Sequence, residues 1–395
     1  MNAATRFSWR FRHGVFALGL LLGGLIASAI FLAGCATKAP APAPVVVVPP
    51  PAPAPLPPPV ATVPPRTELG IARAAFVRDT AAKYGIPPSE IEAALARASI
   101  RESIVAAMAR PAEAKPWRDY RPIFITDGRI NGGRAFLAQH RESLARVEAQ
   151  YGVPAEVIVS IIGVETSYGG NTGKHSVLDA LYTLAFAYPR TGDPAKALRE
   201  HTREQFFRDE LGQLFALARE ERLDIAGLQG SYAGAMGWGQ FMPSSYRAYA
   251  VDGDGDGDRD LFVRGGDTDD LFASIANYFV RKGGWQRGGP VMLRAMRDAN
   301  AADFNAETID PVHTLADLAA RGYRPASAVP PGERATVIRL EGVDGPEYWM
   351  IFRNFQAITR YNTSRLYATA VWQLAQAIAG RPLALRVARH GAGPA

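Results

Sequence analysis

The chain is poor in cysteine, and its charges are close to balance. Cys35 is the one cysteine among 395 residues, and the 44 lysines and arginines exceed the 38 aspartates and glutamates by only six. A single cysteine cannot form a disulfide within the chain, and it excludes a metal site built from several cysteines. A nucleic-acid-binding protein would carry a stronger basic excess, so we expect no nucleic-acid partner.

Charge is absent from Gly14 to Thr37, directly after a basic start that contains Arg6, Arg10 and Arg12. A basic segment followed by an apolar one is typical of a secretory signal peptide, although the length also fits a membrane-spanning anchor. The sequence Leu-Ala-Gly-Cys at residues 32–35 decides between the two, because it resembles the lipobox of bacterial lipoproteins.

We therefore expect residues 1–34 to be a lipoprotein signal peptide and Cys35 to carry lipid, which would anchor the protein to a membrane. Ala36 follows the cysteine. By resemblance to Gram-negative lipoproteins, a residue other than Asp there predicts the periplasmic face of the outer membrane. Residues 35–65 hold thirteen prolines, so they form an expected polyproline linker of roughly 80 Å.

The remaining region, residues 66–390, shows mainly helical periodicity, and the expected class is mainly α (α+β). One β-hairpin is predicted from Arg334–Leu340 and Tyr348–Phe352. The expected helices are Ser89–Ala98, Gly133–Gln150, Pro154–Val164, Ala195–Glu221, Leu271–Lys282 and Thr363–Ala379.

Glu165 is the first candidate for chemistry, because it ends the apolar run Val157–Val164. It lies four residues beyond Ile161 and therefore on the apolar stripe of the helix, while Gly169 and Gly170 supply a helix stop. Partial burial and the negative end of the helix dipole should both raise its pKa, as a general acid near neutral pH requires. A structural glutamate paired with a basic residue is the alternative.

Alternating aspartates from residue 252 to residue 260 form the second signal. Their spacing, with Gly257 at the sixth position, matches the start of an EF-hand loop and predicts a calcium site. Val263 stands at the twelfth position, where a sensor loop has glutamate, so we expect a structural ion. Three downstream aspartates could close the loop: Asp267, Asp269 and Asp270.

The third signal is the segment from Gly230 to Tyr246, which mixes glycines with Tyr, Trp, Phe, Met, Ser and Gln. Aromatic faces stack on sugar rings, and amides and hydroxyls bond to sugar hydroxyl or acetamido groups. The segment therefore favours a sugar ligand, and a glycine-rich packing turn is the alternative.

These signals together resemble the membrane-bound lytic murein transglycosylase B family (glycoside hydrolase family 103). The resemblance rests on Gly-Val-Glu-Thr at residues 163–166, Gly-Ala-Met-Gly-Trp-Gly-Gln-Phe-Met-Pro-Ser at 234–244, the acidic loop, and Ile-Thr-Arg-Tyr-Asn at 358–362. It covers Arg66 to Gly380 and implies a lysozyme-like helical catalytic core at about 140–285, a flanking helical domain and a small domain.

The resemblance implies cleavage of the β-1,4 bond between N-acetylmuramic acid and N-acetylglucosamine without water, which leaves a 1,6-anhydromuramyl end. Glu165 matches the family's catalytic residue. The implied substrate-binding residues are Tyr120, Arg190, Ser231, Gln240, Tyr278, Tyr361, Asn362 and Tyr367. The implied calcium ligands are Asp252, Asp254, Asp256 and Asp258, with Asp270 favoured as the closing carboxylate. Thr191 stands where the family often has a second Arg next to Arg190, so contacts to the peptide stem differ.

A single carboxylate fits this reaction, since ordinary glycosidases need two. One alternative is a hydrolytic muramidase, against which the lack of a clean second carboxylate argues. Another is a non-catalytic peptidoglycan-binding lipoprotein, against which the presence of Glu165 argues. A third is a calcium-sensing adaptor, which Val263 disfavours. The expected partners are peptidoglycan strands, the membrane through Cys35 and peptidoglycan synthases, and the protein is expected to be a monomer.

Overall fold

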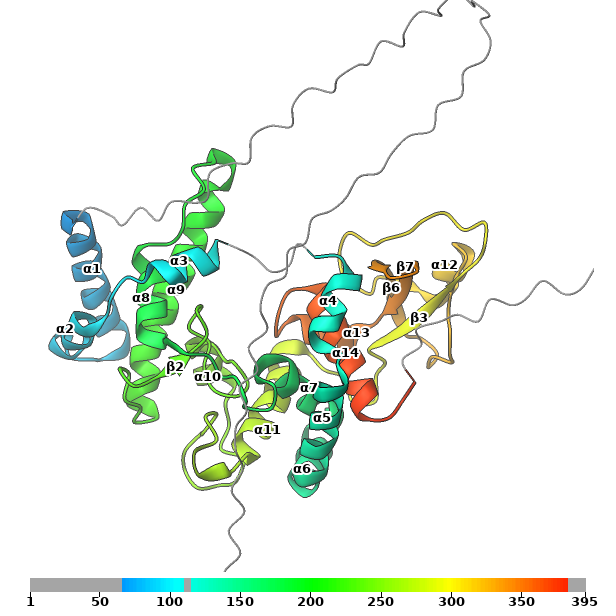
Figure 1. The fold of residues 1–395 in the computed structure, drawn as a ribbon, viewed down its shortest axis with the longest axis horizontal. Helices are drawn as coiled ribbons and strands as arrows, with labels where there is room; N and C mark the ends of the chain where they lie inside the picture. Colours follow the sequence, from blue (N-terminus) through cyan, green and yellow to red (C-terminus); the bar gives the residue numbers. More distant parts are fainter. Residues whose placement is uncertain (1–65, 110–114, 383–395) are drawn as a thin grey trace, which may run out of the picture. The chain divides into compact units, whose positions relative to one another are not determined.

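Residues 66–109 and 115–382 are described by a computed structural model (Figure 1). They belong to the unit Leu56–Ala395, which is separate from the unit Met1–Pro55. The predicted signal peptide, Cys35 and the proline-rich linker lie outside the described residues.

Helices make up more than half of the described residues, as the sequence predicted. The first group comprises α1 (Arg66–Tyr84), α2 (Pro88–Arg97), α3 (Glu102–Met108), α4 (Trp117–Phe124), α5 (Asp127–Gln139), α6 (Arg141–Tyr151), α7 (Ala155–Thr166), α8 (Val177–Phe186) and α9 (Pro194–Glu220). The second group comprises α10 (Pro243–Tyr249), α11 (Asp269–Tyr278), α12 (Leu315–Ala320), α13 (Arg353–Thr359) and α14 (Arg365–Ile378), with the short 3₁₀ helix η2 (Arg264–Gly266) and the π-helix η3 (Phe279–Gly283).

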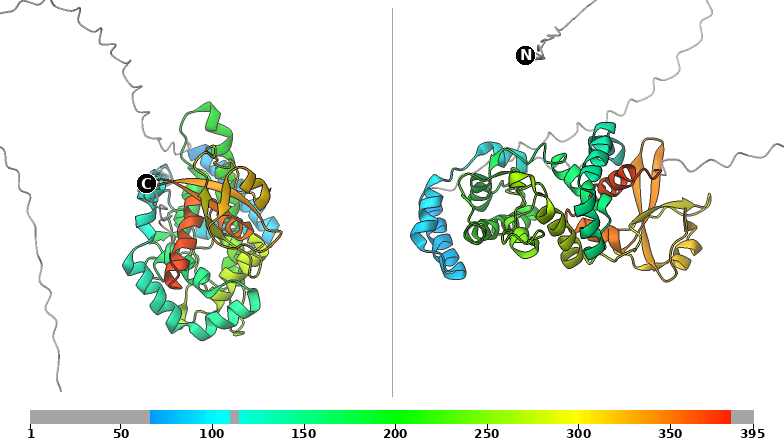
Figure 2. Two further views of the ribbon diagram at one scale, coloured as in Figure 1. Left: turned by 90° about the vertical axis from the view of Figure 1, so that its right-hand side faces the viewer. Right: turned by 90° about the horizontal axis from the view of Figure 1, so that it is seen from below.

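The strands of the described residues form two antiparallel sheets. They are β1 (His175–Ser176), β2 (Gln229–Gly230), β3 (Met292–Arg297), β4 (His313–Thr314), β5 (Tyr323–Pro325), β6 (Arg334–Gly342) and β7 (Gly345–Ile351). β1 pairs with β2, and the other five follow the order β4-β6-β7-β3-β5. Figure 2 shows the long ribbon of β6 and β7 in orange.

Helix α7 lies at the centre of the main core. Every residue from Val157 to Val164 is buried, because the helix is enclosed by α5, α6, α11 and α14. It begins at Ala155, one residue after the predicted start, with Pro154 as the N-cap. Among the described residues no single helix is both long and apolar enough to cross a membrane. Glu165 is thus carried at the end of a helix that its neighbours hold on all sides.

The predicted helix Gly133–Gln150 is wrong, since α5 and α6 are separate helices that meet at His140 (φ −107°, ψ 24°). The His140 ring packs 4.4 Å from the Phe136 ring and 5.5 Å from the Phe272 ring, and its Nδ1 lies 3.1 Å from Thr268 Oγ1. These contacts with Phe136, Phe272 and Thr268 stabilise the break between α5 and α6, and the periodicity within the segment does not predict them.

The predicted hairpin is confirmed by β6 and β7, but the expectation of one hairpin alone is wrong. Three further strands, β3, β4 and β5, extend it to a five-stranded sheet. The sheet covers a second small core that includes Leu318, Tyr323 and Met350. β4 and β5 have only two and three residues, which is too short for an alternating pattern to emerge.

Candidate active site

The end of α7 is shaped by two residues in the left-handed conformation, Ser167 (φ 52°) and Tyr168 (φ 62°). The sequence predicted that Gly169 and Gly170 would stop the helix, but it ends two residues earlier, after Thr166. Tyr168 donates a hydrogen bond from its hydroxyl to the carbonyl of Arg129 at 2.7 Å. Arg129 in turn donates to Ser167 Oγ at 2.9 Å. These contacts with α5 stabilise a turn that would otherwise be strained.

Tyr168 fits into a space that three glycines leave open. A Cβ atom on Gly133 or Gly163 would lie 2.5 or 2.6 Å from the Tyr168 hydroxyl, and one on Gly132 would lie 3.1 Å from its ring. The Phe136 ring stacks on Tyr168 with centroids 5.6 Å apart. The close approach of α5 to α7, and with it the direction in which Glu165 leaves the helix, depends on these glycines.

Glu165 is hydrogen-bonded to Tyr367, which α14 brings back from 202 residues further along the chain. The Tyr367 hydroxyl donates to Glu165 Oε1 at 2.5 Å. Burial raises the pKa of Glu165 to about 7, although the bond from Tyr367 favours the ionised form. The raised pKa predicted from the sequence is confirmed, and the carboxyl can both donate and accept a proton near neutral pH.

Tyrosines form one wall around this carboxyl. Burial and the charge of Glu165 raise the pKa values of Tyr361 and Tyr367 well above the ordinary value, so both remain hydrogen-bond donors. Tyr361 donates to the carbonyl of Gly239 at 2.6 Å. Its ring lies 4.9 Å from the ring of Tyr278, which donates to the carbonyl of Arg360 at 2.6 Å.

Two side chains of the glycine-rich segment have their polar groups largely used by the backbone. Ser231 Oγ accepts hydrogen bonds from the N–H groups of Ala233 at 3.3 Å and Ala235 at 3.1 Å. Gln240 Nε2 donates to the carbonyls of Thr172 at 3.0 Å and Gly237 at 2.9 Å. The side-chain oxygen of Gln240 (Oε1) has no such bond within the described part of the chain, so it can accept a hydrogen bond from a sugar hydroxyl.

The other predicted substrate residues differ in how close they come to Glu165. Tyr120, on α4, is buried and near enough to Tyr367 to raise its pKa. Asn362 is exposed, and its side-chain oxygen accepts a hydrogen bond from the N–H of Ser364 at 3.1 Å. Arg190 forms an ion pair with Glu204 on α9.

Phe241 completes the aromatic wall and was not among the predicted site residues. Its ring contacts those of Tyr278 and Tyr361, with centroids 5.5 and 5.7 Å away. The glycine-rich composition around it had already suggested aromatic surface for a sugar, but no spacing rule distinguishes Phe241 from a core residue.

The acidic loop gathers its carboxylates into one small space. Asp252 accepts hydrogen bonds from the N–H groups of Gly255 at 2.6 Å and Gly257 at 3.0 Å, which curl the loop. Oxygen atoms of Asp252, Asp254 and Asp256 lie within 4.8 Å of one another. A group of hard oxygen donors without nitrogen or sulfur fits calcium or magnesium rather than zinc or copper.

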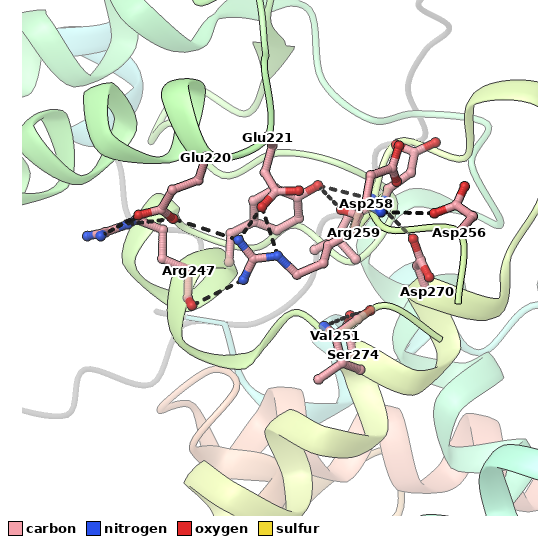
Figure 3. Close-up of polar contacts among 12 residues, drawn as sticks. Glu220, Glu221, Arg247, Val251, Asp256, Asp258, Arg259, Asp270 and Ser274 are labelled. Atoms are coloured by element: carbon pink, nitrogen blue, oxygen red, sulfur yellow. Dashed lines mark hydrogen bonds and ion pairs between the residues drawn. The ribbon is translucent and has the colours of Figure 1, made fainter. Parts of the chain in front are cut away.

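Asp270, in the first turn of α11, is the downstream carboxylate that joins this group. Its oxygens lie within 4.8 Å of those of Asp256 and Asp258, and Figure 3 shows the three side chains around the same space. Asp270 accepts from the N–H groups of Gly253 and Asp260, each at 2.6 Å, and burial raises its pKa to about 6.

The other two downstream candidates are placed differently. Asp269 forms an ion pair with Arg146 at 2.5 Å. Asp267 lines a cavity of about 110 Å³ to which Asp254, Asp256, Asp258 and Asp270 also contribute. Asp260 also lines it and was not predicted as a ligand, although it belongs to the alternating run. The oxygen donors around this cavity fit a calcium ion of the predicted kind.

Arg259 links the acidic loop to the glutamates at the end of α9. Its Nε donates to Glu221 Oε1 at 2.8 Å, and Glu220 lies 3.7 Å from the same guanidinium. Figure 3 shows this side chain directed away from Asp256 and Asp270 and toward the end of α9. Arg247 binds Glu220 as well, at 2.6 Å.

Comparison with known proteins agrees with this geometry. Residues 71–376 match the family described as Transglycosylase SLT domain. The chain is 39% identical over 314 residues to membrane-bound lytic murein transglycosylase B of Escherichia coli strain K12. The aligned region covers 77% of this chain and 81% of that protein.

Solved structures of related proteins superimpose on the same region. The soluble lytic transglycosylase SltB1 of Pseudomonas aeruginosa matches with a TM-score of 0.69 and 45% identity, over 78% of this chain and 98% of that one. The Escherichia coli lytic transglycosylase Slt35 in complex with calcium matches with a TM-score of 0.68 and 38% identity, over 78% and 92% of the two chains.

Proposed function

Because this chain belongs to the Transglycosylase SLT domain family and is a lytic murein transglycosylase acting on peptidoglycan, we propose that Glu165 alone serves as its acid and then its base. The observation that carries this proposal is the Glu165 carboxyl itself. Its pKa is raised to about 7, and no second carboxylate among the described residues is close enough to alter that pKa.

In the first step, protonated Glu165 gives its proton to the glycosidic oxygen while the bond from that oxygen to C1 of N-acetylmuramic acid breaks. The acetamido oxygen of the same sugar stabilises the positive charge that develops at C1. Tyr367 is placed to stabilise the carboxylate that Glu165 becomes, since a phenol donates a stronger hydrogen bond to an ionised acceptor.

In the second step, the Glu165 carboxylate takes the proton of the C6 hydroxyl as O6 bonds to C1. The proton that Glu165 gave is thereby replaced, and the product is a 1,6-anhydro ring without addition of water. A hydrolytic muramidase would need a second carboxylate to activate water or attack C1. The buried Tyr120, Tyr278 and Tyr367 and the partly buried Tyr361 around Glu165 support exclusion of water instead.

The glycan would lie against the tyrosine wall next to Glu165. Gln240, through its free carbonyl oxygen, and the rings of Tyr278 and Tyr361 are the groups best placed to orient it. Tyr367, bonded to Glu165, belongs to the same proposed set. Residues with a more distant or more structural placement complete it: Tyr120, Arg190, Ser231 and Asn362.

A calcium ion in the acidic loop is proposed to stabilise the fold. Its proposed ligands are Asp252, Asp254, Asp256, Asp258 and Asp270. The convergence of these oxygens and the calcium complex of the related Slt35 support this assignment. When bound, the ion supplies positive charge that offsets the repulsion among the carboxylates.

The proposed location is the periplasmic face of the outer membrane, with lipid on Cys35 and the linker of residues 36–65 carrying the enzyme to the wall. The lipobox-like sequence supports the anchor, and the related Escherichia coli protein is described as membrane-bound. Peptidoglycan synthases are the proposed protein partners.

The test is mass spectrometry of the fragments released from purified sacculi by the wild type and by Glu165→Gln. Wild-type fragments should carry 1,6-anhydro ends, and the variant should lose at least roughly 100-fold in rate because general acid–base catalysis is worth 10²–10⁴-fold. Glu156→Gln is the matched control, since Glu156 lies in the first turn of α7 and pairs with Arg381 at 2.8 Å. Reducible muramic acid ends from the wild type, or an active Glu165→Gln enzyme, would contradict the mechanism.

A further inference from the structure

Trp238 connects the acidic loop to the end of α7. Leu261, fully buried, follows Asp260 directly, and its carbonyl accepts a hydrogen bond from the N–H of Trp238 at 2.9 Å. The carbonyl of Trp238 lies 3.1 Å from the hydroxyl of Thr166, the residue after Glu165. One backbone unit therefore bonds to the loop on one side and to the catalytic helix on the other.

The Thr166 hydroxyl has one proton and two acceptors at the same distance. It lies 3.1 Å from the carbonyl of Ile162 as well as from that of Trp238. The Ile162 carbonyl already accepts from the N–H of Tyr168 at 3.3 Å, whereas the Trp238 carbonyl has no other donor in the described segments. Because a partly buried carbonyl without a donor is costly, the proton is better used on Trp238.

Close packing leaves this connection little freedom to move. A Cβ on Gly237 would lie 2.5 Å from the Leu261 carbonyl oxygen, and a Cβ on Gly169 would lie 2.3 Å from the Trp238 ring. The Trp238 indole also lies 6.3 Å from the Phe136 ring of α5. A displacement of the Leu261 backbone would therefore displace Trp238 as well.

The loop side of the connection depends on the aspartates. Asp270 accepts a hydrogen bond from the N–H of Asp260 at 2.6 Å, and Asp260 immediately precedes Leu261. The neighbouring carboxylates repel one another unless a cation lies among them. Cation binding should thus fix Asp260 and Leu261 in the position that the Trp238 N–H requires.

We propose that Thr166 and Trp238 are positioning residues that transmit the state of the acidic loop to Glu165. With the cation bound, Leu261 holds Trp238, Trp238 holds Thr166, and the end of α7 keeps Glu165 in place beneath Tyr367. This inference rests on the proposed role of Glu165. It predicts a change in kcat with little change in KM, because the group being positioned acts on the transition state.

The first experiment combines a variant with cation removal. Thr166→Val removes the hydroxyl at nearly constant volume, and Thr166→Ser keeps it as the conservative control. Release of anhydro-ended fragments and the melting temperature are measured for each protein in calcium chloride and in EGTA. EGTA should lower the wild-type kcat by up to roughly 100-fold, since a misplacement of about 1 Å at the reacting group can cost that much.

Thr166→Val in calcium should show a loss of similar size, and EGTA should lower its kcat less than about twofold further, because the connection is already broken. Its melting temperature should still fall in EGTA as that of the wild type does. Thr166→Ser should respond to EGTA like the wild type. The inference is overturned if EGTA leaves the wild-type kcat unchanged, or if the losses from EGTA and Thr166→Val multiply.

A second variant breaks the connection at its other end and serves if Thr166→Val does not fold. Gly237→Ala places a methyl group against the Leu261 carbonyl, at a glycine with φ 71°. Gly288→Ala is its control, because Gly288 has a similar φ of 72° and nothing within 4 Å of the added Cβ. Gly237→Ala should lose kcat and its response to EGTA, while Gly288→Ala should keep both. Equal behaviour of the two variants would overturn the inference, whereas hydrolytic products or an active Glu165→Gln would instead refute the proposed mechanism.

Discussion

Glu165 differs from an exposed glutamate because its carboxyl is held away from water next to a single phenol. The folded protein therefore favours the protonated form at a pH where the unfolded chain is ionised, with a pKa of about 7 against 4.5. A raised carboxyl pKa means that the residue's contribution to stability is fully present below pH 4.5 and is lost as the pH rises through 7.

Replacing Glu165 with Gln should consequently stabilise the protein at alkaline pH. Gln cannot ionise, so Glu165→Gln should exceed the wild type by at most about 3 kcal/mol at pH 8 and by almost nothing at pH 4. Denaturant unfolding at both pH values measures this difference. Glu156→Gln, which lies on the same helix, should show no such gain, and a variant equal to the wild type at pH 8 would mean that Glu165 is well solvated.

The bond from Tyr367 makes a separate prediction about the pH dependence of the rate. It lowers the Glu165 pKa, so its loss in Tyr367→Phe should raise that pKa and keep the acid protonated to higher pH. The fall of kcat/KM on the alkaline side should move up by about one to two pH units.

Tyr278→Phe is the comparison for this prediction. It also loses a phenol hydroxyl in the same wall, but one that bonds to the carbonyl of Arg360. Its pH profile should keep the wild-type position. If the two variants shift alike, the Glu165 pKa is not set by the Tyr367 bond.

At this scale the sequence predicted the environment of Glu165 but not its partner. The apolar stripe and helix end were enough to expect a raised pKa. The contact between Tyr367 and Glu165 could not be predicted, because 202 residues separate the two and no local pattern encodes such a contact. Tyr367 entered the expected site only through the family resemblance.

The meeting of α5 and α7 sets the geometry of the helix end. Gly163→Ala would normally stabilise a helix by up to about 1 kcal/mol. Here the added Cβ would lie 2.6 Å from the Tyr168 hydroxyl, and overpacking of this kind costs about 1–3 kcal/mol. We expect a lower unfolding free energy and a loss of activity, measured by denaturant titration and by release of anhydro-ended fragments.

Gly212→Ala in α9 is the matched control for this helix glycine. Its added Cβ would meet nothing closer than 3.5 Å, so the variant should be neutral or more stable. A stabilised Gly163→Ala enzyme with normal activity would show that Tyr168 does not need the space.

The long helices α9 and α14 were predicted to within two residues, since their apolar periodicity extends over several turns, whereas α1 was not among the expected helices. The errors occur where a tertiary contact overrides the local pattern. His140 interrupts a continuous amphipathic stretch to pack against Phe136 and Phe272. The strands β4 and β5 exist only because longer neighbours pair with them.

The stability of the whole unit should depend on the acidic loop. A calcium ion at 100 times its dissociation constant would add about 2.7 kcal/mol, which corresponds to a rise in melting temperature of roughly 5 °C for a chain of this size. Chelation should reverse that rise. Thermal unfolding with calcium chloride and with EGTA measures it.

Asp256→Ala should remove the response, because Asp256 belongs to both groups of converging carboxylates. Asp298→Ala, which changes an exposed aspartate paired with Arg324 in the small sheet region, should keep it. An identical wild-type melting curve in both solutions would exclude a stabilising ion.

For the whole molecule, the order of motifs predicted the fold class and the reaction, because four separate patterns match one family. The way the acidic loop, the glycine-rich segment and α7 interlock was not predictable. It depends on backbone bonds such as that from Trp238 to Leu261, which leave no trace in residue type.

The separation of 202 residues between Glu165 and Tyr367 also has a consequence for biosynthesis. A ribosome finishes α7 long before it adds α14, so a growing chain contains the proton donor without its phenol partner. A copy that ends early through interrupted translation or a cut before Tyr367 remains in that incomplete state. We expect such a copy, which lacks α14 and the Tyr367 bond to Glu165, to cleave the wall less efficiently than the full-length enzyme.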